Sequence, residues 1–443
     1  MIRHIVCLLL TAALPACAAG LRAGAARVDI TPEGPIWMSG YASRNHPSEG
    51  VRQRLYTRAL AIDGAGGKVV IVTADVVGIP AELGDAVAAR AGRQFGIERA
   101  RLVLNASHTH TGPVVWPNLS MMWDLPEGER QKLRDYAARL QDAMVEAIGK
   151  AVAGLGPAQL TLGFGEAGFA VNRRQYTPRG VVIGVNPDGP VDHQVPVIKI
   201  AGADGKVRGV LFAYACHNTT LTGEFYELSG DYAGAAEAQL ESDYPGSVAL
   251  FLQLCAGDQN PNPRSKPELA VEHGRALAAE VRRVMEGGMV PLHAPVRAAW
   301  VVTRLRFAPQ PRSVYEADLA NPKASPALRN RARKMLDSPV SDTAYPVQAL
   351  RFGKDLTLLA LGGEVVVDYD LRAKREYPGE PLIVAAYSNS VMGYIPSERV
   401  LKEGGYEAVD NLIYYGQPGP FAPGVEDAVF AAIHQAMKEV GRR

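Results

Sequence analysis

The sequence has no long apolar run beyond its first twenty residues, and its charge is nearly balanced, with 47 Lys and Arg against 46 Asp and Glu. A basic excess would point to nucleic acid and a strongly acidic tail to a disordered or solvating role, so composition favours neither class. The chain also has no GxSxG nucleophile elbow and no Walker A loop. At 443 residues it is long enough to bury a large core.

Cysteine is scarce as well. Of four cysteines, Cys7 and Cys17 lie near the N-terminus, which leaves Cys216 and Cys255 for the rest of the chain. Neither has a CxxC partner, so a cysteine-based zinc site is disfavoured. The two residues could pair as a disulfide in an oxidising compartment or remain two small buried thiols, and the sequence leaves both readings open.

The first twenty residues have the order of a secretory signal peptide, with Arg3, then the apolar stretch IVCLLLTAAL, then the small-residue stretch PACAAG. LPAC, ending at Cys17, resembles a lipoprotein box, whereas ACA and CAA fit ordinary signal peptidase. We therefore expect residues 1–20 to be a signal peptide and residues 21–443 to form one domain. The protein is expected to be periplasmic, secreted or lipid-anchored to the envelope.

Apolar strand-like runs alternate with amphipathic helix-like runs, which predicts an α/β fold with mixed sheets and packed helices. The expected strands cover residues 68–75, 101–107, 158–164, 195–202, 208–216, 247–255, 355–363 and 382–388. The expected helices cover residues 81–96, 128–154, 232–243, 268–287 and 426–441. Residues 308–345 are polar and are interpreted as a helical insertion within the domain.

The stretch GFGEAG (163–168) matches GxGxxG but does not indicate a nucleotide site. A dinucleotide-binding turn opens a helix. Here the chain continues into FAVNRRQYTPRG, which has no helical pattern.

The stretch SHTHTGP (107–113) holds two of the nine histidines, His108 and His110. In an extended segment such positions face the same side, and neutral imidazole is the commonest metal ligand in proteins. The pair could equally be two surface or half-buried histidines that share backbone hydrogen bonds. Two nitrogens alone do not hold Zn²⁺, so a metal site needs ligands from elsewhere in the chain.

Polar side chains that follow other apolar strands are the candidates: His217, the loop 258–262 (DQNPN), Glu364 at the start of a helix-like run, and Tyr394. In α/β sheets, such residues gather at the carboxyl ends of strands. Each also has a structural reading. His217 could be a core histidine whose hydrogen bonds are satisfied, and the loop residues could form Asx turns. Glu364 could be a charge at a helix N-terminus, and Tyr394 could be a packed aromatic residue with a hydrogen-bonded hydroxyl.

Several motifs resemble those of the neutral/alkaline, non-lysosomal ceramidase family, specifically its N-terminal catalytic domain. They follow the family's order from about residue 26 to about residue 415, and they are ARVDITPEG, SGYASR, RLYTRALAI, VTAD, SHTHTGP, VNRR, CHNTT with SGDY, CAGDQNPN, LGGE and SNSVMGYIPSERVLKEGGYE. The most specific part of the resemblance is the HTHxGP motif, followed later in the chain by the GE motif and then by the Y…YE motif. The resemblance implies a zinc-dependent amide hydrolase.

The resemblance also implies one Zn²⁺ per chain, bound by His108, His217, Glu364 and Tyr394. Two imidazoles, a carboxylate and a phenolate are acceptable ligands for zinc and leave a position for water. Tyrosine has an ordinary pKa of about 10, so the cation itself must favour the phenolate.

In the same resemblance, His110 matches a residue that moves protons, and Arg173 and Tyr406 match polar residues that line the pocket. Zinc-bound water would attack the carbonyl, and His110 would pass its proton to the leaving nitrogen. Arg173 and Tyr406 would hold the oxyanion.

Two departures from the family pattern bear on the substrate. Asn260 stands where the family's ceramidases have a serine in the GDxSPN loop. It cannot be a nucleophile, although it can donate a hydrogen bond to substrate. The chain is also expected to lack the family's C-terminal immunoglobulin-like domain, and EAVDNLIYYGQPGPF replaces the family's small-residue run after Tyr406.

The expected function is therefore that of an exported zinc hydrolase acting on the amide bond of a small-molecule or lipid substrate, with N-acyl sphingoid lipids as the default. Membrane-surface association is part of this expectation and nucleic acid is not. A hydrolase of another ester, lactone, amide or sugar-derived substrate is the second reading. A non-catalytic envelope protein that retains the fold is the third.

Overall fold

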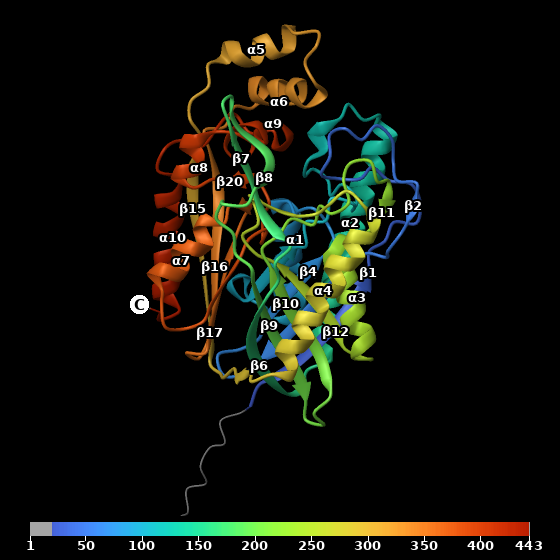
Figure 1. The fold of residues 1–443 in the computed structure, drawn as a ribbon, viewed down its shortest axis with the longest axis vertical. Helices are drawn as coiled ribbons and strands as arrows, with labels where there is room; N and C mark the ends of the chain where they lie inside the picture. The colour runs from blue at the N-terminus through green and yellow to red at the C-terminus, as the bar shows by residue number, and fades with distance from the viewer. Residues whose placement is uncertain (1–19, 443) are drawn as a thin grey trace, which may run out of the picture.

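The computed structural model describes residues 20–442, so all but the last residue of the expected signal peptide lies outside the described residues. Two sheets form the centre of the molecule (Figure 1). The larger has nine strands, in the order β12 (Val248–Gln253), β10 (Val207–Tyr214), β9 (Gln194–Gly202), β6 (Gly156–Glu166), β1 (Arg22–Asp29), β3 (Tyr56–Asp63), β4 (Val69–Ala74) and β5 (Leu102–Ala106), with β14 (Val290–Pro291) paired to β6. The smaller has four strands, β15 (Val296–Arg306), β16 (Asp342–Phe352), β17 (Leu356–Leu361) and β19 (Leu382–Ala385).

The two sheets pack face to face. Leu60 and Leu250 of the large sheet belong to the same buried apolar cluster as Leu358 and Ile383 of the small sheet. These strands are buried on both faces, which is why they read as continuous apolar runs in the sequence. The predicted mixed α/β fold is thus confirmed, as a sandwich of two mixed sheets.

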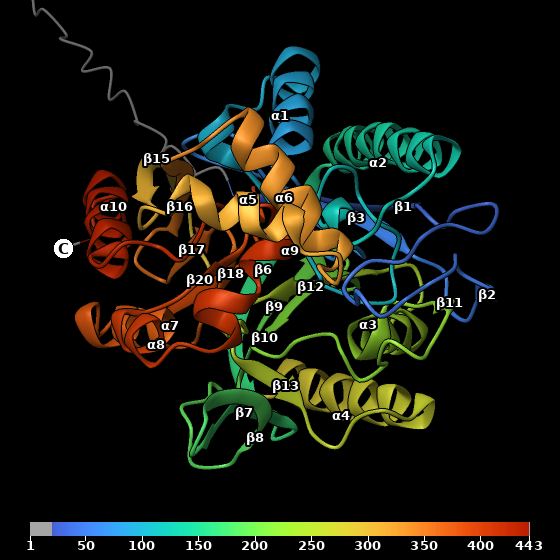
Figure 2. The same cartoon turned by 90° about the horizontal axis from the view of Figure 1, so that it is seen from above.

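Helices cover the outer face of each sheet (Figure 2). The large sheet carries α1 (Ala81–Phe95), α2 (Glu127–Ala153), α3 (Asp231–Asp243) and α4 (Pro267–Glu286), and the small sheet carries α7 (Asp368–Glu376) and α10 (Val425–Glu439). In α2, Leu133, Tyr136, Leu140, Met144 and Ile148 are buried. Their spacing of three or four residues forms the apolar stripe that packs on β1 and β3.

The remaining elements lie mainly in loops at the ends of the strands. They are β2 (Gly50–Val51), β7 (Ala170–Thr177), β8 (Gly180–Asn186), β11 (Glu227–Leu228), β13 (Gln259–Pro261), β18 (Glu364–Val365), β20 (Tyr394–Ile395), α5 (Arg312–Ala320), α6 (Pro326–Asp337), α8 (Glu398–Glu403), α9 (Leu412–Tyr415), the 3₁₀ turns η1 (Arg99–Arg101) and η2 (Ser120–Met122), and the π-helical turn η3 (Tyr406–Asp410). The predicted helical insertion is confirmed, since α5 and α6 lie between β15 and β16 and project at one end of the sandwich (Figure 1).

Residues 163–168, the GxGxxG match, form the end of β6 and a short turn into strand β7, so no helix follows them. Among the longer strands, the sequence prediction missed β1, β3, β7, β8, β15 and β16. In β15 buried and exposed positions are interspersed along the strand, and this gives no continuous apolar run.

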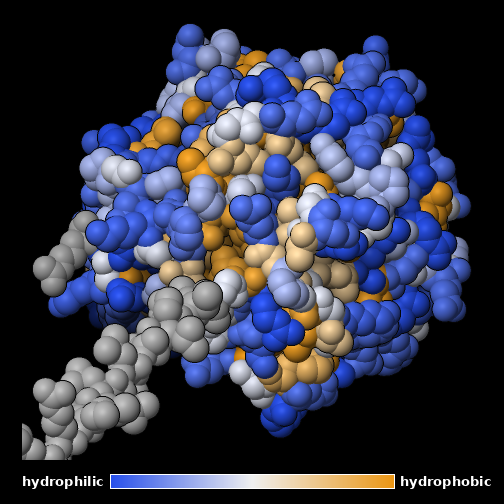
Figure 3. Space-filling view, turned by 90° about the horizontal axis from the view of Figure 1, so that it is seen from below, coloured by the Kyte–Doolittle hydropathy of each residue, from blue (hydrophilic) through white to orange (hydrophobic). Residues whose placement is uncertain are grey.

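The end of the molecule opposite α5 and α6 has a hydrophilic rim around a central patch of apolar residues (Figure 3). Within residues 20–442, none of the helices combines the length and the apolarity that a membrane crossing requires.

Candidate active site

The candidate residues gather at one end of the sandwich because the strands that precede them run in parallel there. β4 pairs in parallel with β5, and β10 with β12. His108 follows β5 and His217 follows β10. β18 and β20 also pair in parallel, with Glu364 directly opposite Tyr394. The sequence-based expectation that these side chains meet at strand ends is therefore met by all four candidate ligands.

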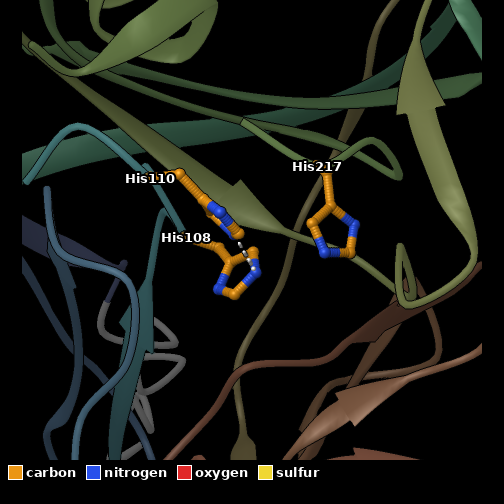
Figure 4. Close-up of side chains that lie close together, drawn as sticks. All are labelled: His108, His110 and His217. Carbon is orange, nitrogen blue, oxygen red and sulfur yellow. Dashed lines mark hydrogen bonds between the residues drawn. The ribbon is translucent and has the colours of Figure 1, made fainter. Parts of the chain in front are cut away.

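The segment holding the two histidines of the HTH motif is a loop and not an extended strand. His108 has a φ of 63°, in the left-handed region, so the expectation that positions i and i+2 of a strand face one side is wrong here. The two rings nevertheless meet, with 2.9 Å between their Nε2 atoms (Figure 4). Both residues are buried, His108 to 1% and His110 to 9% exposure, which rules out the surface reading.

The backbone sets the tautomers of the two imidazoles that face the centre of the site. His108 Nδ1 lies 2.5 Å from the carbonyl oxygen of Val77, and His217 Nδ1 lies 2.7 Å from that of Ala256. Because a carbonyl oxygen only accepts, each Nδ1 carries the proton and each Nε2 presents a lone pair. Burial, with help from the Arg173 charge, lowers the pKa of His217 to about 3, so this ring is neutral.

The Glu364 carboxylate faces the Nε2 lone pairs of both His108 and His217, and the Tyr394 phenol faces that of His217. Glu364 Oε2 lies 3.0 Å from His108 Nε2 and 3.2 Å from His217 Nε2, and the Tyr394 hydroxyl lies 3.2 Å from His217 Nε2. Two imidazole lone pairs and a carboxylate oxygen cannot hydrogen-bond one another. Their spacing is close to the roughly 3.3 Å between ligand atoms of a tetrahedral shell with Zn–N bonds of about 2.0–2.1 Å. The donor set therefore fits a divalent metal.

A second combination of ligands is also geometrically available. One nitrogen each from His108, His110 and His217 lie within 4.8 Å of one another and could hold a metal. In that arrangement His110 would be a ligand and not a proton carrier. His110 Nδ1 is buried without a hydrogen-bond partner among the described residues.

Glu364 does not open a helix, as the sequence suggested, because it lies in β18 and α7 begins only at Asp368. Its second oxygen, Oε1, accepts a hydrogen bond from the Tyr415 hydroxyl. Only Oε2 therefore remains free to face the histidines.

Burial raises the pKa of Tyr394 well above its ordinary value, although the neighbouring Arg173 acts in the opposite direction. The Tyr394 hydroxyl accepts a hydrogen bond of 2.9 Å from Arg173 Nη2. Tyr394 is thus a phenol unless a cation favours the phenolate, as expected for a metal ligand.

Arg173 links the ligands to the rest of the pocket. Its Nη1 lies 3.2 Å from His217 Nε2 and 3.3 Å from Asn260 Oδ1. Its Nε donates to Glu407 Oε1 at 2.7 Å, and Arg174 donates to the other oxygen of Glu407 at 2.6 Å. Sequence reasoning missed Glu407, although it is the residue after Tyr406 in GGYE. It also missed Tyr415, for which the sequence held no signal.

The four predicted catalytic residues line one cavity of about 250 Å³ next to the candidate ligands; its lining comprises Gly40, Tyr41, Ala42, His110, Met122, Arg173, Ile183, Thr219, Asn260, Arg264, Tyr394, Tyr406 and Tyr414. Gly40 has a φ of 92°, and a Cβ there would come within 2.4 Å of His110 Nδ1. Only glycine fits against the His110 ring at this point.

The polar residues of the loop 258–262 have different roles. Asp258 is fully buried and accepts from the Val367 N–H at 2.9 Å and from Asn172 Nδ2 at 3.0 Å, so it fixes the loop to the segment before α7 and to β7. Burial raises its pKa to about 6. Asn260 lines the cavity, its Oδ1 accepts from Arg173 and Thr219, and no hydrogen bond within residues 20–442 uses its Nδ2. Asn262 is exposed.

The two cysteines near the site do not form a disulfide. Cys216 and Cys255 are both free and buried, so the reading as two small buried thiols is confirmed. Burial raises the pKa of each thiol well above its ordinary value.

Imidazole nitrogens and a carboxylate oxygen that converge at strand ends define a candidate metal centre in a mixed α/β sandwich. The family model of the neutral/alkaline non-lysosomal ceramidase N-terminal domain matches residues 21–270. The chain belongs to this family, as its motifs suggested.

Two curated relatives are neutral ceramidases. That of Pseudomonas aeruginosa is 31% identical over 274 residues, which are 59% of this chain and 40% of the relative. That of Mycobacterium tuberculosis is 26% identical over 285 residues, which are 58% of this chain and 43% of the relative. The matched part of this chain thus spans about two fifths of the length of these relatives.

Solved ceramidase structures share the fold. The crystal structure of the neutral ceramidase from Pseudomonas aeruginosa aligns with 96% of this chain and 74% of that chain, with a TM-score of 0.73 at 21% identity. A ceramidase complexed with C2 aligns over the same shares, with a TM-score of 0.71 at 20% identity. The common architecture extends beyond residue 270, into the part of the chain that supplies Glu364 and Tyr394.

Proposed function

We propose that the protein is a zinc-dependent hydrolase that cleaves the amide bond of an N-acylated amine, with N-acyl sphingoid lipids as the default substrate class. The observation that carries the proposal is the convergence of His108 Nε2, His217 Nε2 and Glu364 Oε2, three acceptor atoms with neighbours at 3.0–3.2 Å. Family membership supports the amide hydrolase chemistry. Zinc suits this mixture of nitrogen and oxygen ligands.

In this proposal His108, His217, Glu364 and Tyr394 hold one zinc ion. When bound, the metal would lower the pKa of a water molecule and polarise the substrate carbonyl. His110 would take the proton of the attacking water and deliver it to the leaving nitrogen. The position of His110 supports this role, because its ring both lines the cavity and touches His108.

Arg173, Tyr406 and Asn260 would stabilise the negative charge that develops on the carbonyl oxygen. All three line the cavity, and Asn260 has an unused Nδ2 donor there. Because asparagine cannot form an acyl-enzyme, direct attack by water is the mechanism that this loop favours.

The surroundings of the cavity support an acyl chain on the substrate. A larger cavity of about 540 Å³ shares Tyr414 with the first and contains Trp116, Trp123, Met121 and Met392. On the other side, the hairpin of β7 and β8 exposes Val182, Ile183 and Val185, and Ile183 also lines the catalytic cavity. We include membrane-surface association through this hairpin in the proposal.

A second candidate is a hydrolase of the same fold for another ester, lactone or amide. The polar side chains in the cavity next to the ligands favour it, since two arginines, Asn260 and Thr219 belong to its lining. Under either candidate we propose that the protein is exported. Mass spectrometry of the mature N-terminus distinguishes lipidated Cys17 from a start near Ala19 or Gly20.

The test combines metal analysis with a hydrolysis screen. Purified protein is expected to hold about one equivalent of zinc and to hydrolyse fluorogenic N-acyl amines, with ester and glycoside probes run in parallel. A chelator should abolish hydrolysis, and added zinc should restore it. Less than a tenth of an equivalent after zinc addition would refute the metal site. Hydrolysis of esters alone would favour the second candidate, and no hydrolysis by metal-loaded protein would favour a non-catalytic envelope protein.

A further inference from the structure

We propose that Arg264 binds an anionic group of the substrate, so that the preferred substrate is an N-acyl amine with a carboxylate, phosphate or sulfate a few bonds from the scissile amide. Arg264 lines the cavity next to the candidate metal ligands, and the proposed chemistry leaves it without a role. The inference rests on the proposed amide hydrolysis and narrows its substrate class.

Arg264 is held at the cavity by a loop that is fixed on both sides of it. The Asn262 N–H donates to the Phe169 carbonyl oxygen at 2.8 Å, and the Ser265 N–H donates to the Thr220 carbonyl oxygen at 2.8 Å. The side chain is half-buried. Its guanidinium is therefore a positioned part of the wall and not a freely moving surface charge.

The contacts of Arg264 do not neutralise its charge. Its Nη2 donates to the Tyr41 hydroxyl at 3.1 Å, and that hydroxyl donates to the Leu221 carbonyl oxygen at 3.2 Å. Burial raises the pKa of Tyr41 to about 12, so Tyr41 is neutral. The Nε atom of Arg264 is buried and has no hydrogen-bond partner among the described residues.

Of the two arginines that line the cavity, Arg173 is balanced by a carboxylate and Arg264 is not. Arg173 and Arg174 share Glu407, with contacts of 2.7 and 2.6 Å. Within residues 20–442, no carboxylate forms an ion pair with Arg264. Asp231 is close enough for its charge to interact with Arg264, but its two oxygens accept from the Leu221 and Tyr232 N–H groups.

A half-buried guanidinium with an unused donor is costly unless a ligand supplies the counter-charge. Arginine suits this task because its planar fork matches the oxygens of a carboxylate or a phosphate. A neutral N-acyl amine leaves the charge uncompensated, whereas an anionic one pairs with it. The cavity thus contains both a place for the scissile bond, beside His110 and Arg173, and a place for an anion, beside Arg264.

The kinetic test uses three substrates that differ in one group: N-dodecanoylglycine, N-dodecanoyl-O-phosphoethanolamine and the neutral N-dodecanoylethanolamine. The wild type should prefer one or both anionic substrates in kcat/KM. Arg264→Gln should lower kcat/KM for them by about 10- to 100-fold and by less than threefold for the neutral substrate. Arg264→Lys should recover part of the loss. Arg275→Gln removes an exposed charge from α4 and is the matched control that should change neither value.

A binding test gives a second readout that does not depend on turnover. Dansylglycine and the neutral dansylethanolamine carry a sulfonamide in place of the amide, and their fluorescence reports binding to the zinc-loaded and the chelator-treated protein. Wild type should bind dansylglycine more tightly, and Arg264→Gln should abolish the difference in both forms. Equal binding of the two probes by wild type, or unchanged preference in Arg264→Gln, would overturn the inference. If the preference for dansylglycine disappears only when the metal is removed by the chelator, the metal and not Arg264 binds the anion. This outcome would also overturn the inference.

The two proposals can fail separately. If the neutral substrate is hydrolysed as well as the anionic ones, the role of Arg264 is refuted and the amide hydrolase stands. If no amide is hydrolysed but Arg264 still selects dansylglycine, the cavity binds an anion and the proposed reaction is refuted.

Discussion

The two parts of the chain contribute different chemistry to one site. Residues 21–270, which match the family model, supply the candidate nitrogen ligands His108 and His217. The part after residue 286 supplies the oxygen ligands Glu364 and Tyr394, from two short paired strands. Neither part holds all four of the proposed ligands, so the centre formed by His108, His217, Glu364 and Tyr394 exists only where the two sheets of the sandwich pack together.

The two parts also differ in how the ligands are supported. The backbone carbonyls of Val77 and Ala256 orient the two histidines. Glu364 depends instead on the hydroxyl of Tyr415. Substitution can remove a side chain but not a carbonyl, so we expect changes around the ligands to act mainly through the C-terminal part. The predictions below test this difference.

The largest effect is expected from the nitrogen ligands themselves. His108→Ala and His217→Ala should each lose zinc and activity together, because each leaves too few ligands for a stable site. Elemental analysis after zinc reconstitution measures the metal, and circular dichroism verifies that the variants are folded. A stoichiometric zinc content in either variant would contradict the assignment.

His110→Ala should retain zinc and lose turnover by roughly 10²–10⁴-fold, the usual contribution of a positioned proton-transfer group. The measurement is kcat beside metal content in the same preparation. If His110→Ala is the variant that loses zinc, the metal is held by the three histidines and the roles within the HTH motif are reversed.

The strands, the helices and most of the site were predictable from sequence where the signal is local. Continuous apolar runs marked the strands buried on both faces, and the polar residues after them marked His217 and Glu364. Tyr415 could not be found in this way, because its contact with Glu364 spans 51 positions and depends on how α9 packs. The left-handed backbone of His108 was also hidden, since nothing in SHTHTGP distinguishes a loop from the end of a strand.

Asn260→Ala should lower kcat by up to about 10²–10³-fold, the effect of removing one oxyanion donor, with zinc content unchanged. Pre-steady-state kinetics should show no acyl-enzyme burst in the wild type. A covalent acyl adduct in intact-mass spectra taken during turnover would refute direct attack by water. Unchanged kcat in Asn260→Ala would instead assign Asn260 to a purely structural turn.

The smallest effect is expected from Tyr415→Phe, which removes one hydroxyl and retains the ring. The lost group is the donor to Glu364 Oε1. Without it the carboxylate is free to rotate or to present both oxygens, and partners of this kind typically contribute 10- to 100-fold to metal affinity. Zinc affinity, measured by competition with a chromogenic chelator, should weaken by that factor. At saturating zinc, kcat should recover most of its wild-type value.

The neighbouring Tyr414→Phe is the matched control for zinc affinity, because no hydrogen bond of the Tyr414 hydroxyl occurs within residues 20–442. If both variants weaken zinc binding equally, the effect comes from the packing of α9 and not from the hydroxyl of Tyr415. If neither does, Glu364 is held by its own strand pairing with Tyr394. In that case the C-terminal part orients its ligands through the backbone, as the N-terminal part does. The two parts then differ only in the ligand atoms that they supply, which are nitrogen in the first part and oxygen in the second.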